Sequence, residues 1–315
     1  MRFVSLALAC ICFSMQFIFT KLFQKRAGGT LHSAVWNSIL SGTVLCAVLF
    51  FMNGFRVAFS ASSVLFGLLY SVSIVVCVSA SVIGLSFESV GSMTFYTLLG
   101  GMILPFVYGM VFLKERPSVF RWIGFVLLIA AAAVPFIAKL SGGDAELPSS
   151  RGDHNGKRSR AKAFFCAAAV FISNGAVSIA TTAAMRAENA VGENDFLLTA
   201  TVIRIGLCLL MLAYIGARRR IFLPEDQKTG RAVRPAVFLL LFAICCGYAL
   251  LNGAGNIFNL YCAGTMEASL QYPVISAACI VLSSLFGLLF FKERPGRGDI
   301  IGIAISLTGL VLFIF

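Results

Sequence analysis

The sequence predicts an all-α integral membrane protein with ten transmembrane helices, arranged as two inverted five-helix repeats. Hydrophobic residues make up 59% of the 315 positions, charged residues only 12%, and the mean hydropathy is +0.93. A soluble domain of this length would be far more polar. Long apolar runs alternate with short polar stretches, and one four-residue motif occurs twice in matching surroundings. Such runs are expected to be helices, because lipid offers no hydrogen-bond partner to an exposed backbone.

Ten apolar runs are long enough to cross a bilayer, which takes about 20 residues of helix. The first run starts close to Met1 and is longer than the apolar core of a signal peptide, so we expect it to stay in place as a membrane helix. None of the runs alternates apolar and polar residues as a half-buried strand does. The expected spans are residues 3–22, 31–52, 62–84, 89–113, 119–138, 162–184, 195–216, 235–258, 267–291 and 298–315.

A polar linker divides the ten runs into two sets of five. Residues 139–161 contain Gly, Ser and Pro together with a cluster of Lys and Arg. We therefore expect a first five-helix repeat over residues 1–138 and a second over 162–315. An odd number of helices in each repeat gives the repeats opposite orientations, an arrangement common among secondary transporters.

A repeated motif indicates that both halves follow one plan. Lys114-Glu115-Arg116-Pro117 recurs 178 positions later over residues 292–295, with two apolar residues before each copy and Ile-Gly after it. Proline disfavours helical geometry in the preceding residue and is well tolerated at the first position of a helix. Each copy is therefore predicted to form a sharp turn, with its proline at the start of the next span and its basic side chains near the headgroups.

These features resemble the EamA-like family of the drug/metabolite transporter superfamily. The resemblance rests on five-plus-five helices, on a fourth or ninth helix that ends in Phe-Leu-Lys-Glu-Arg or Phe-Phe-Lys-Glu-Arg, and on the Ile-Gly and late Gly of the following helix. The stretch from Glu267 to Phe313 matches best, whereas the first half has Ala131 to Ala133 in place of the late glycine. The resemblance covers essentially the whole chain and implies a transporter fold without specifying a substrate.

Motif and residue content argue against several other function classes. The chain has no P-loop, which excludes ATP hydrolysis by this chain as the driving force. The ten cysteines lie mostly inside apolar runs, and the two histidines are His32 and His154, so we expect no metal site, no cofactor and no catalytic constellation. The net charge of +12 lies in loops between spans, where membrane topology explains it better than nucleic-acid binding does.

The expected function is therefore secondary active transport rather than enzymatic catalysis. A small polar or amphipathic metabolite would cross by alternating access through a central cavity. The protein would lie in the plasma or inner membrane, in contact with lipid, as a monomer or homodimer. The alternative is a multi-pass scaffold or receptor-like protein without transport activity.

Arg204 is the most informative single residue. It lies near the middle of the apolar run from Phe196 to Tyr214, where a charge costs about 2.5–3.5 kcal/mol on insertion scales and is expected to face the bundle interior. The resemblance supports the position, because EamA-like helices of this rank often carry an arginine, although the first half has Asn37 there. The acceptor of Arg204 is either a substrate anion or a structural partner, namely helix carbonyl groups or Glu267.

Polar side chains recur at helical spacing on several spans. Tyr248, Asn252 and Asn256 are four residues apart and share one helix face. Amides donate and accept hydrogen bonds, so this face suits either a polar solute in a cavity or hydrogen bonds between helices. The other candidate substrate-binding residues are Gln16, Asn37, Tyr96, Asn174, Ser178 and Gln271.

Two acidic residues and two prolines are candidates for coupling or gating. Glu88 and Glu267 precede the fourth and ninth spans. An acidic side chain there either interacts with the helix dipole or carries a coupled proton. Pro105 and Pro273 lie inside the same two spans and are candidates for kinks that move during transport.

The distribution of basic residues predicts the orientation in the membrane. Loops on one side carry eighteen of the 25 Lys and Arg residues, loops on the side of both termini carry six, and Arg204 is the remaining one. By the positive-inside rule, the linker 139–161 is cytoplasmic and both termini are outside. Members of the superfamily more often have both termini inside, so the resemblance and the charge count disagree, and we follow the charge count.

Overall fold

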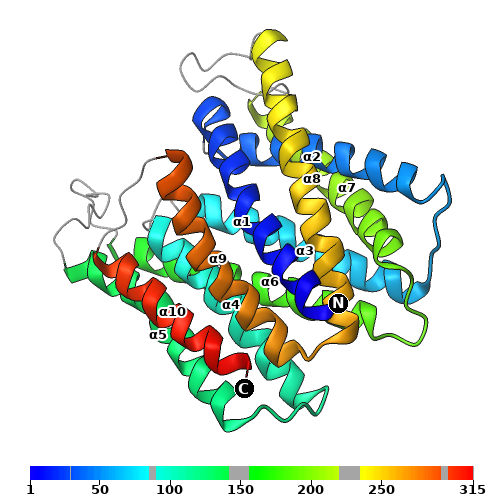
Figure 1. Ribbon diagram of the computed structural model, residues 1–315. Helices are drawn as coiled ribbons and strands as arrows, with labels where there is room; N and C mark the ends of the chain where they lie inside the picture. The colour runs from blue at the N-terminus through cyan, green and yellow to red at the C-terminus, as the bar shows by residue number, and fades with distance from the viewer. Residues whose placement is uncertain (29, 85–89, 142–155, 220–234, 292–296, 315) are drawn as a thin grey trace. The chain divides into compact units, whose positions relative to one another are not determined.

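The computed structural model describes residues 1–315 apart from 29, 85–89, 142–155, 220–234, 292–296 and 315. The described residues form ten α-helices and no β-strand (Figure 1), which confirms the predicted all-α class. Every predicted span coincides with a helix, and α1, α6 and α8 extend at least five residues beyond the expected ends. The helices are α1 (Arg2–Ala27), α2 (Leu31–Met52), α3 (Ala61–Gly84), α4 (Val90–Val111), α5 (Val119–Ser141), α6 (Gly156–Met185), α7 (Glu193–Arg219), α8 (Pro235–Thr265), α9 (Ala268–Phe291) and α10 (Arg297–Ile314).

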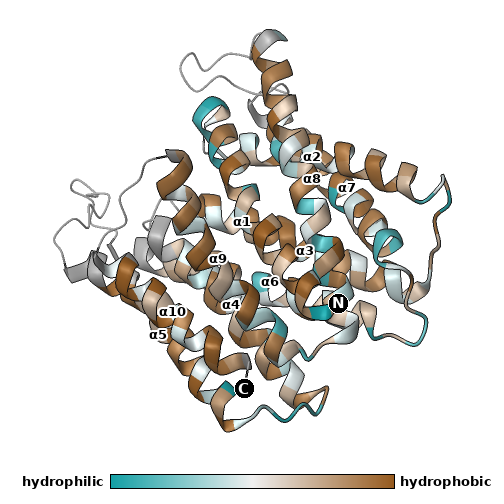
Figure 2. Ribbon diagram, viewed as in Figure 1, coloured by the Kyte–Doolittle hydropathy of each residue, from teal (hydrophilic) through white to brown (hydrophobic). Residues whose placement is uncertain are grey.

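Eight of the described helices are long and apolar enough to cross a membrane, as a multi-pass membrane protein requires. Figure 2 shows hydrophobic residues along the helices and hydrophilic residues mainly at helix ends and in loops. The apolar parts of α5 and α10 among the described residues are shorter, Val119–Val134 and Ile300–Phe313.

Serine and threonine hydroxyls fix the starts of α2 and α3. At α2, the backbone N–H of Ser33 donates to the Thr30 hydroxyl (3.2 Å) and the N–H of Thr30 donates to the Ser33 hydroxyl (3.1 Å). Ser60 and Ser63 form the same reciprocal pair at α3, at 2.9 and 3.1 Å. The first N–H groups of a helix have no partner inside it, so these capping boxes determine where each helix begins.

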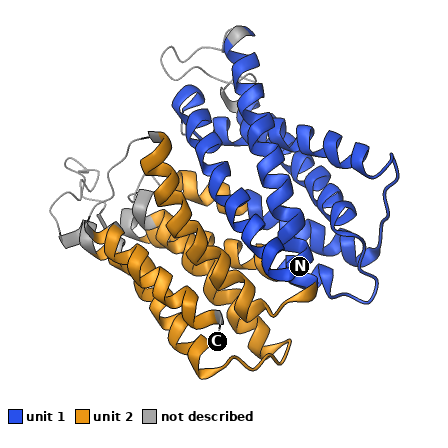
Figure 3. Cartoon of the chain, viewed as in Figure 1, with its two compact units in different colours: residues 1–75, 180–264 blue, residues 76–179, 265–315 orange. Residues whose placement is uncertain are grey.

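The helices divide into two compact units (Figure 3). Unit 1 contains residues 1–75 and 180–264, and unit 2 contains residues 76–179 and 265–315. Helices α3 and α6 therefore contribute to both units. Each unit combines segments from both halves of the chain, and the repeat boundaries at residues 138 and 162 stay a prediction.

Within unit 1, small residues allow α2 and α3 to approach α7 closely. A Cβ atom on Gly42 would lie 2.9 Å from Cγ1 of Ile205. The hydroxyl of Ser71 on α3 donates to the backbone carbonyl of Ala200 on α7 (2.6 Å). Apolar contact between α2 and α7 comes from Val35, Ile39, Cys208 and Leu212.

Within unit 2, α5 and α10 meet at two glycines. A Cβ atom on Gly124 would lie 3.0 Å from the carbonyl oxygen of Gly309 and 2.9 Å from the ring of Phe313. A Cβ atom on Gly309 would lie 2.7 Å from Leu128. A larger side chain at either position would push against the other helix, because the two backbones approach closely, as in other membrane helix pairs with small residues at the contact.

We predict that Gly124→Ala lowers the stability of the protein by about 1–3 kcal/mol, because the added methyl group overpacks the contact with α10. The measurement is thermal unfolding of the purified protein in detergent. Gly206→Ala is the matched control, since a Cβ atom there meets nothing within 4 Å. In a helix this control is expected to be neutral or stabilising by up to about 1 kcal/mol. Equal melting temperatures for the two variants would contradict the close approach.

Candidate functional site

The polar face of α8 forms hydrogen bonds with two other helices of unit 1. Asn252 Nδ2 donates to Oε1 of Gln16 on α1 (2.7 Å). Asn256 Nδ2 donates to the backbone and side-chain oxygens of Asn252 (2.8 and 3.2 Å). The hydroxyl of Tyr70 on α3 donates to Oδ1 of Asn256 (3.0 Å). We call these four residues the amide network, which connects α1, α3 and α8.

The amide network is shielded from the surroundings of the protein. Tyr70 and Asn256 are buried, and Gln16 and Asn252 are half-buried. An amide buried without a partner costs several kcal/mol in an apolar medium, whereas a connected network satisfies its members. The structure therefore contains the interhelical hydrogen bonds that the sequence offered as one of two roles for Asn252 and Asn256.

Arg204 lies near Tyr70 of this network, and only 7% of the residue is exposed. It is within electrostatic reach of the hydroxyls of Tyr70 on α3 and Tyr248 on α8. The thiols of Cys46 on α2 and Cys208 on α7 are also within reach. The guanidinium is thus buried among the helices of its own unit, as a charge in the middle of an apolar helix requires.

Arg204 has no ion-pair partner among the residues that the structure describes. Its Nε–H, a buried donor, has no hydrogen-bond acceptor. Among the residues that the structure describes, no carboxylate forms an ion pair with this guanidinium. Glu267, the structural partner considered from the sequence, is paired with Arg121. Because a buried charge without a counter-charge costs several kcal/mol, the burial of Arg204 is energetically unfavourable.

Asn37 is the residue that the predicted repeat aligns with Arg204. It lies on α2, half-buried, and its Oδ1 accepts a hydrogen bond from the thiol of Cys245 on α8 (3.4 Å). Cys245 precedes Tyr248 by one helical turn. Asn37 therefore connects α2 to the polar face of α8.

Two apolar grooves flank α2 in unit 1. The first has a volume of about 560 Å³, and Cys46, Phe59 and Val202 are among its lining residues. The second has a volume of about 380 Å³ and lies between α2 and α8. Phe59 and Val202 are largely exposed, so the first groove lies at the surface of the unit. Cys46 is shared by this groove and the surroundings of Arg204.

Four predicted binding residues lie in unit 2, where two of them join helices. Asn174 Nδ2 on α6 donates to the backbone carbonyl of Thr97 on α4 (2.7 Å). The hydroxyl of Tyr272 on α9 donates a hydrogen bond to the backbone carbonyl of Ser178 (2.8 Å). This contact therefore uses the backbone of Ser178 and not its side chain. Both bonds connect α6 to neighbouring helices.

The other two predicted residues of unit 2 are Tyr96, which is half-buried, and Gln271, which is buried. Tyr96 packs against a cluster formed by Met93, Ala167 and Val170. Gln271 is completely buried in α9. Gln16, Asn37, Arg204, Tyr248, Asn252 and Asn256 thus belong to unit 1, and Tyr96, Asn174, Ser178 and Gln271 belong to unit 2.

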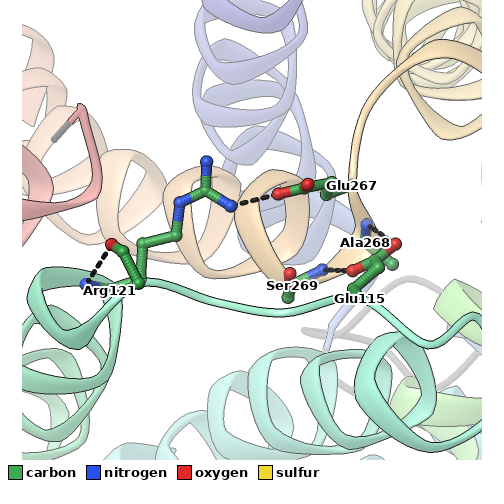
Figure 4. A network of polar contacts seen from close by, with 6 residues as sticks. Glu115, Arg121, Glu267, Ala268 and Ser269 are labelled. Atoms are coloured by element: carbon green, nitrogen blue, oxygen red, sulfur yellow. Dashed lines mark hydrogen bonds and ion pairs between the residues drawn. The ribbon is translucent and has the colours of Figure 1, made fainter.

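A second polar cluster lies at the start of α9 in unit 2 (Figure 4). The two carboxylate oxygens of Glu115 accept the backbone N–H groups of Ala268 and Ser269, each at 2.9 Å. Glu267 forms an ion pair with Arg121 of α5. Glu115 therefore caps α9 from the connection between α4 and α5, where a negative charge also interacts favourably with the helix dipole.

The four candidates for coupling and gating lie in different surroundings. Glu267 is 46% exposed and forms an ion pair with Arg121, and its role in coupling stays a prediction. Glu88 lies outside the described residues. Pro105 and Pro273 lie inside α4 and α9, as expected, and both helices continue past them.

The turn at the first copy of the repeated motif is sharp, as predicted, but its proline is not the first residue of α5. Lys114 has φ of 55°, a left-handed conformation that ends the helical path of α4. Helix α5 begins at Val119, because the Ser118 hydroxyl accepts the N–H of Arg121 (3.3 Å) and caps the helix. The predicted place of Pro117 is therefore wrong by two residues. The second copy, 292–295, lies outside the described residues.

Sequence reasoning missed two residues that matter in these clusters. Tyr70 belongs to the amide network. The sequence feature that could have indicated it is a tyrosine hydroxyl within the third apolar run. Glu115 was seen only as part of a turn motif, and nothing local indicates that it caps a helix 153 residues later. Both omissions concern contacts between distant parts of the chain.

Comparison with known proteins supports the fold. No protein-family model matches the chain, and no curated protein matches its sequence. A solved structure described only as "Crystal structure of protein" is similar over 98% of each chain, with a TM-score of 0.67 and 13% sequence identity. At this identity the similarity concerns the fold alone, so a very different sequence adopts a similar arrangement of helices.

We predict that Tyr70→Phe lowers the stability by about 1–2 kcal/mol, because it removes the hydroxyl that donates to Oδ1 of buried Asn256. Tyr108→Phe, in unit 2, is the matched control; that ring stacks on Phe112 at 5.2 Å and its packing survives the change. Reversible unfolding in mixed micelles measures both variants. If the two lose equal stability, the hydroxyl of Tyr70 contributes nothing specific.

We predict that Glu115→Gln lowers the stability by about 1–2 kcal/mol, because a carboxamide replaces one charged acceptor with a donor facing a backbone N–H. Glu188→Gln is the control, as this exposed glutamate is expected to change stability by less than about 0.5 kcal/mol. Hydrogen exchange of the first turn of α9 is the local readout. Unchanged protection of Ala268 and Ser269 in Glu115→Gln would rule out the capping role.

Proposed function

We propose that this chain is a secondary active transporter that moves a small polar or amphipathic metabolite by alternating access. In this proposal it is a member of the EamA-like family in the drug/metabolite transporter superfamily, located in the cell membrane. The observation that carries the proposal is the amide network together with Arg204, inside helices that are apolar enough to cross a membrane.

The cost of burying these groups supports a functional reading. Ionisable residues in the middle of membrane helices are rare, and they mark substrate or ion pathways more often than structural sites. Packing alone gives no reason to retain Arg204, because an apolar side chain of similar size would avoid the uncompensated charge. A polar solute that crosses the membrane needs polar contacts at this depth.

We also propose the inverted five-helix repeats as the architecture that performs transport. Helices of the same rank in the two halves pack in pairs: α2 with α7, α4 with α9 and α5 with α10. Gly124 and Gly309, the Ile-Gly glycine of one half and the late glycine of the other, meet in the last of these pairs. Pairing of equivalent helices is expected where two repeats are related by an axis in the membrane plane.

The alternative remains a scaffold or receptor-like membrane protein. The amide network satisfies its own hydrogen bonds and would serve a static bundle as well. The two proposals differ in one measurable property, since only a transporter exchanges its ligand between the two sides of a sealed membrane.

We predict that the protein, reconstituted into proteoliposomes, performs counterflow. Amino acids, nucleosides and organic acids are first screened for an increase in melting temperature, and labelled forms of the stabilising compounds are then tested for counterflow into preloaded vesicles. Counterflow is the expected result, because alternating access returns the carrier faster when it is loaded. Compounds that bind without any counterflow would favour the scaffold.

We further predict that Asn256→Leu weakens ligand binding by about tenfold or more while the folded protein remains obtainable, since one or more hydrogen bonds of the network are lost. Gly206→Ala, with open space at its Cβ, controls for substitution in the membrane helices. Binding is measured by calorimetry on purified protein. Equal affinity in both variants would remove the amide network from the site.

A further inference from the structure

Among the charged residues of unit 1 that the structure describes, Arg204 alone is buried. The middle parts of the other helices, residues 3–20, 31–52, 61–75 and 235–264, contain no Asp, Glu, Lys or Arg. No counter-charge is therefore available from these segments. A single positive charge, 7% exposed, remains among apolar helices.

The two kinds of polar group in unit 1 have different needs. The amides of Gln16, Asn252 and Asn256 satisfy one another, with the hydroxyl of Tyr70 as a further donor. Arg204 has a buried Nε–H without an acceptor. The group that would complement Arg204 is therefore a negatively charged hydrogen-bond acceptor. The neighbouring amides already supply neutral polar groups.

The charge of the ligand follows from the number of charged residues in the middle parts of the unit 1 helices, which is one, Arg204. A carboxylate presents two oxygens in the plane of a guanidinium and brings one negative charge, which neutralises Arg204 completely. A phosphate dianion would bring a second charge for which those helix segments hold no cation. The apolar groove wall at Cys46, close to Arg204, matches an apolar ligand body next to the charged group.

We propose that unit 1 binds a small organic anion with one carboxylate group and an apolar body, and that Arg204 is the residue that recognises the carboxylate. The inference deepens the proposed transport function, on which its biological meaning rests. Binding, however, is measurable without transport.

The first experiment compares two probes that differ only in charge. Hexanoate and hexanamide are titrated at neutral pH into the full chain in nanodiscs of phosphatidylcholine, a lipid without net charge. Hexanoate is expected to bind about tenfold or more tightly than hexanamide, because only its charge pairs with Arg204. Equal affinity of the two probes, or no binding of hexanoate, would overturn the proposal.

Substitutions then test whether Arg204 is responsible. Arg204→Gln should abolish the preference for hexanoate, and Arg204→Lys should keep part of it, because a lysine retains the charge without the planar fork. Arg56→Gln is the control, since it removes one positive charge from an exposed position. A preference for hexanoate that persists in Arg204→Gln would assign the recognition to another residue and refute the proposal.

The stability of the ligand-free protein provides an independent readout. Arg204→Met removes an uncompensated buried charge and keeps a long side chain, so its melting temperature should exceed that of the wild type. If Arg204 had a structural partner, the same substitution would lower the melting temperature. A lower melting temperature of Arg204→Met, or failure of the variant to fold, would show a structural role and overturn the inference.

Inorganic phosphate and oleate separate the possible sources of the anion. Stronger stabilisation by phosphate than by hexanoate would contradict the single-carboxylate assignment. Binding of oleate but not of hexanoate would identify a membrane lipid in place of a soluble metabolite, and it would equally reject the small anion.

Failure of this inference and failure of the transport proposal give different results. Hexanoate binding that depends on Arg204, without counterflow of any binding compound, leaves the inference intact and removes transport. Counterflow of a neutral or cationic solute that Arg204→Gln does not affect supports transport and refutes the inference.

Discussion

Polar groups in this chain have to find their hydrogen-bond partners inside the protein, because its helices are built for apolar surroundings. This constraint explains why the described residues form helices alone, since a helix satisfies its backbone within its own segment. It also explains the reciprocal Ser and Thr caps at α2 and α3, which satisfy N–H groups that the helix leaves open. The amide network obeys the same rule, as each of its amides is bonded to another member.

Close helix contact is the second requirement, and small residues provide it. Gly124 and Gly309 bring α5 and α10 to backbone contact, and Gly42 gives Ile205 its place between α2 and α7. Lipid is as apolar as the helix surfaces, so helices gain stability from tight packing and from hydrogen bonds rather than from burial of apolar area. The glycine-rich composition is therefore part of the folding mechanism.

Charged residues are treated in two ways. At the start of α9, Glu115 is bonded to two backbone N–H groups, and Glu267 is paired with Arg121, so each negative charge has a defined partner. Arg204 is buried in the middle of α7 and has an open donor. Charges of the first kind organise a helix end, whereas Arg204 is the charge to which we propose that a ligand binds.

The sequence by itself determined the helical class, the number and approximate positions of the helices, the place of Arg204 inside an apolar helix and the shared face of the α8 asparagines. These features follow from local properties: the length of an apolar run, the position of a charge within it, and the 3.6-residue spacing of polar groups. Which helices face one another was decided only by the tertiary structure. Tyr70 meets Asn256 and Glu115 meets the start of α9 across 186 and 153 residues, and no local pattern encodes such contacts. The division of the predicted binding residues between two units has the same cause, since packing of distant helices, and not their order along the chain, determines which side chains meet.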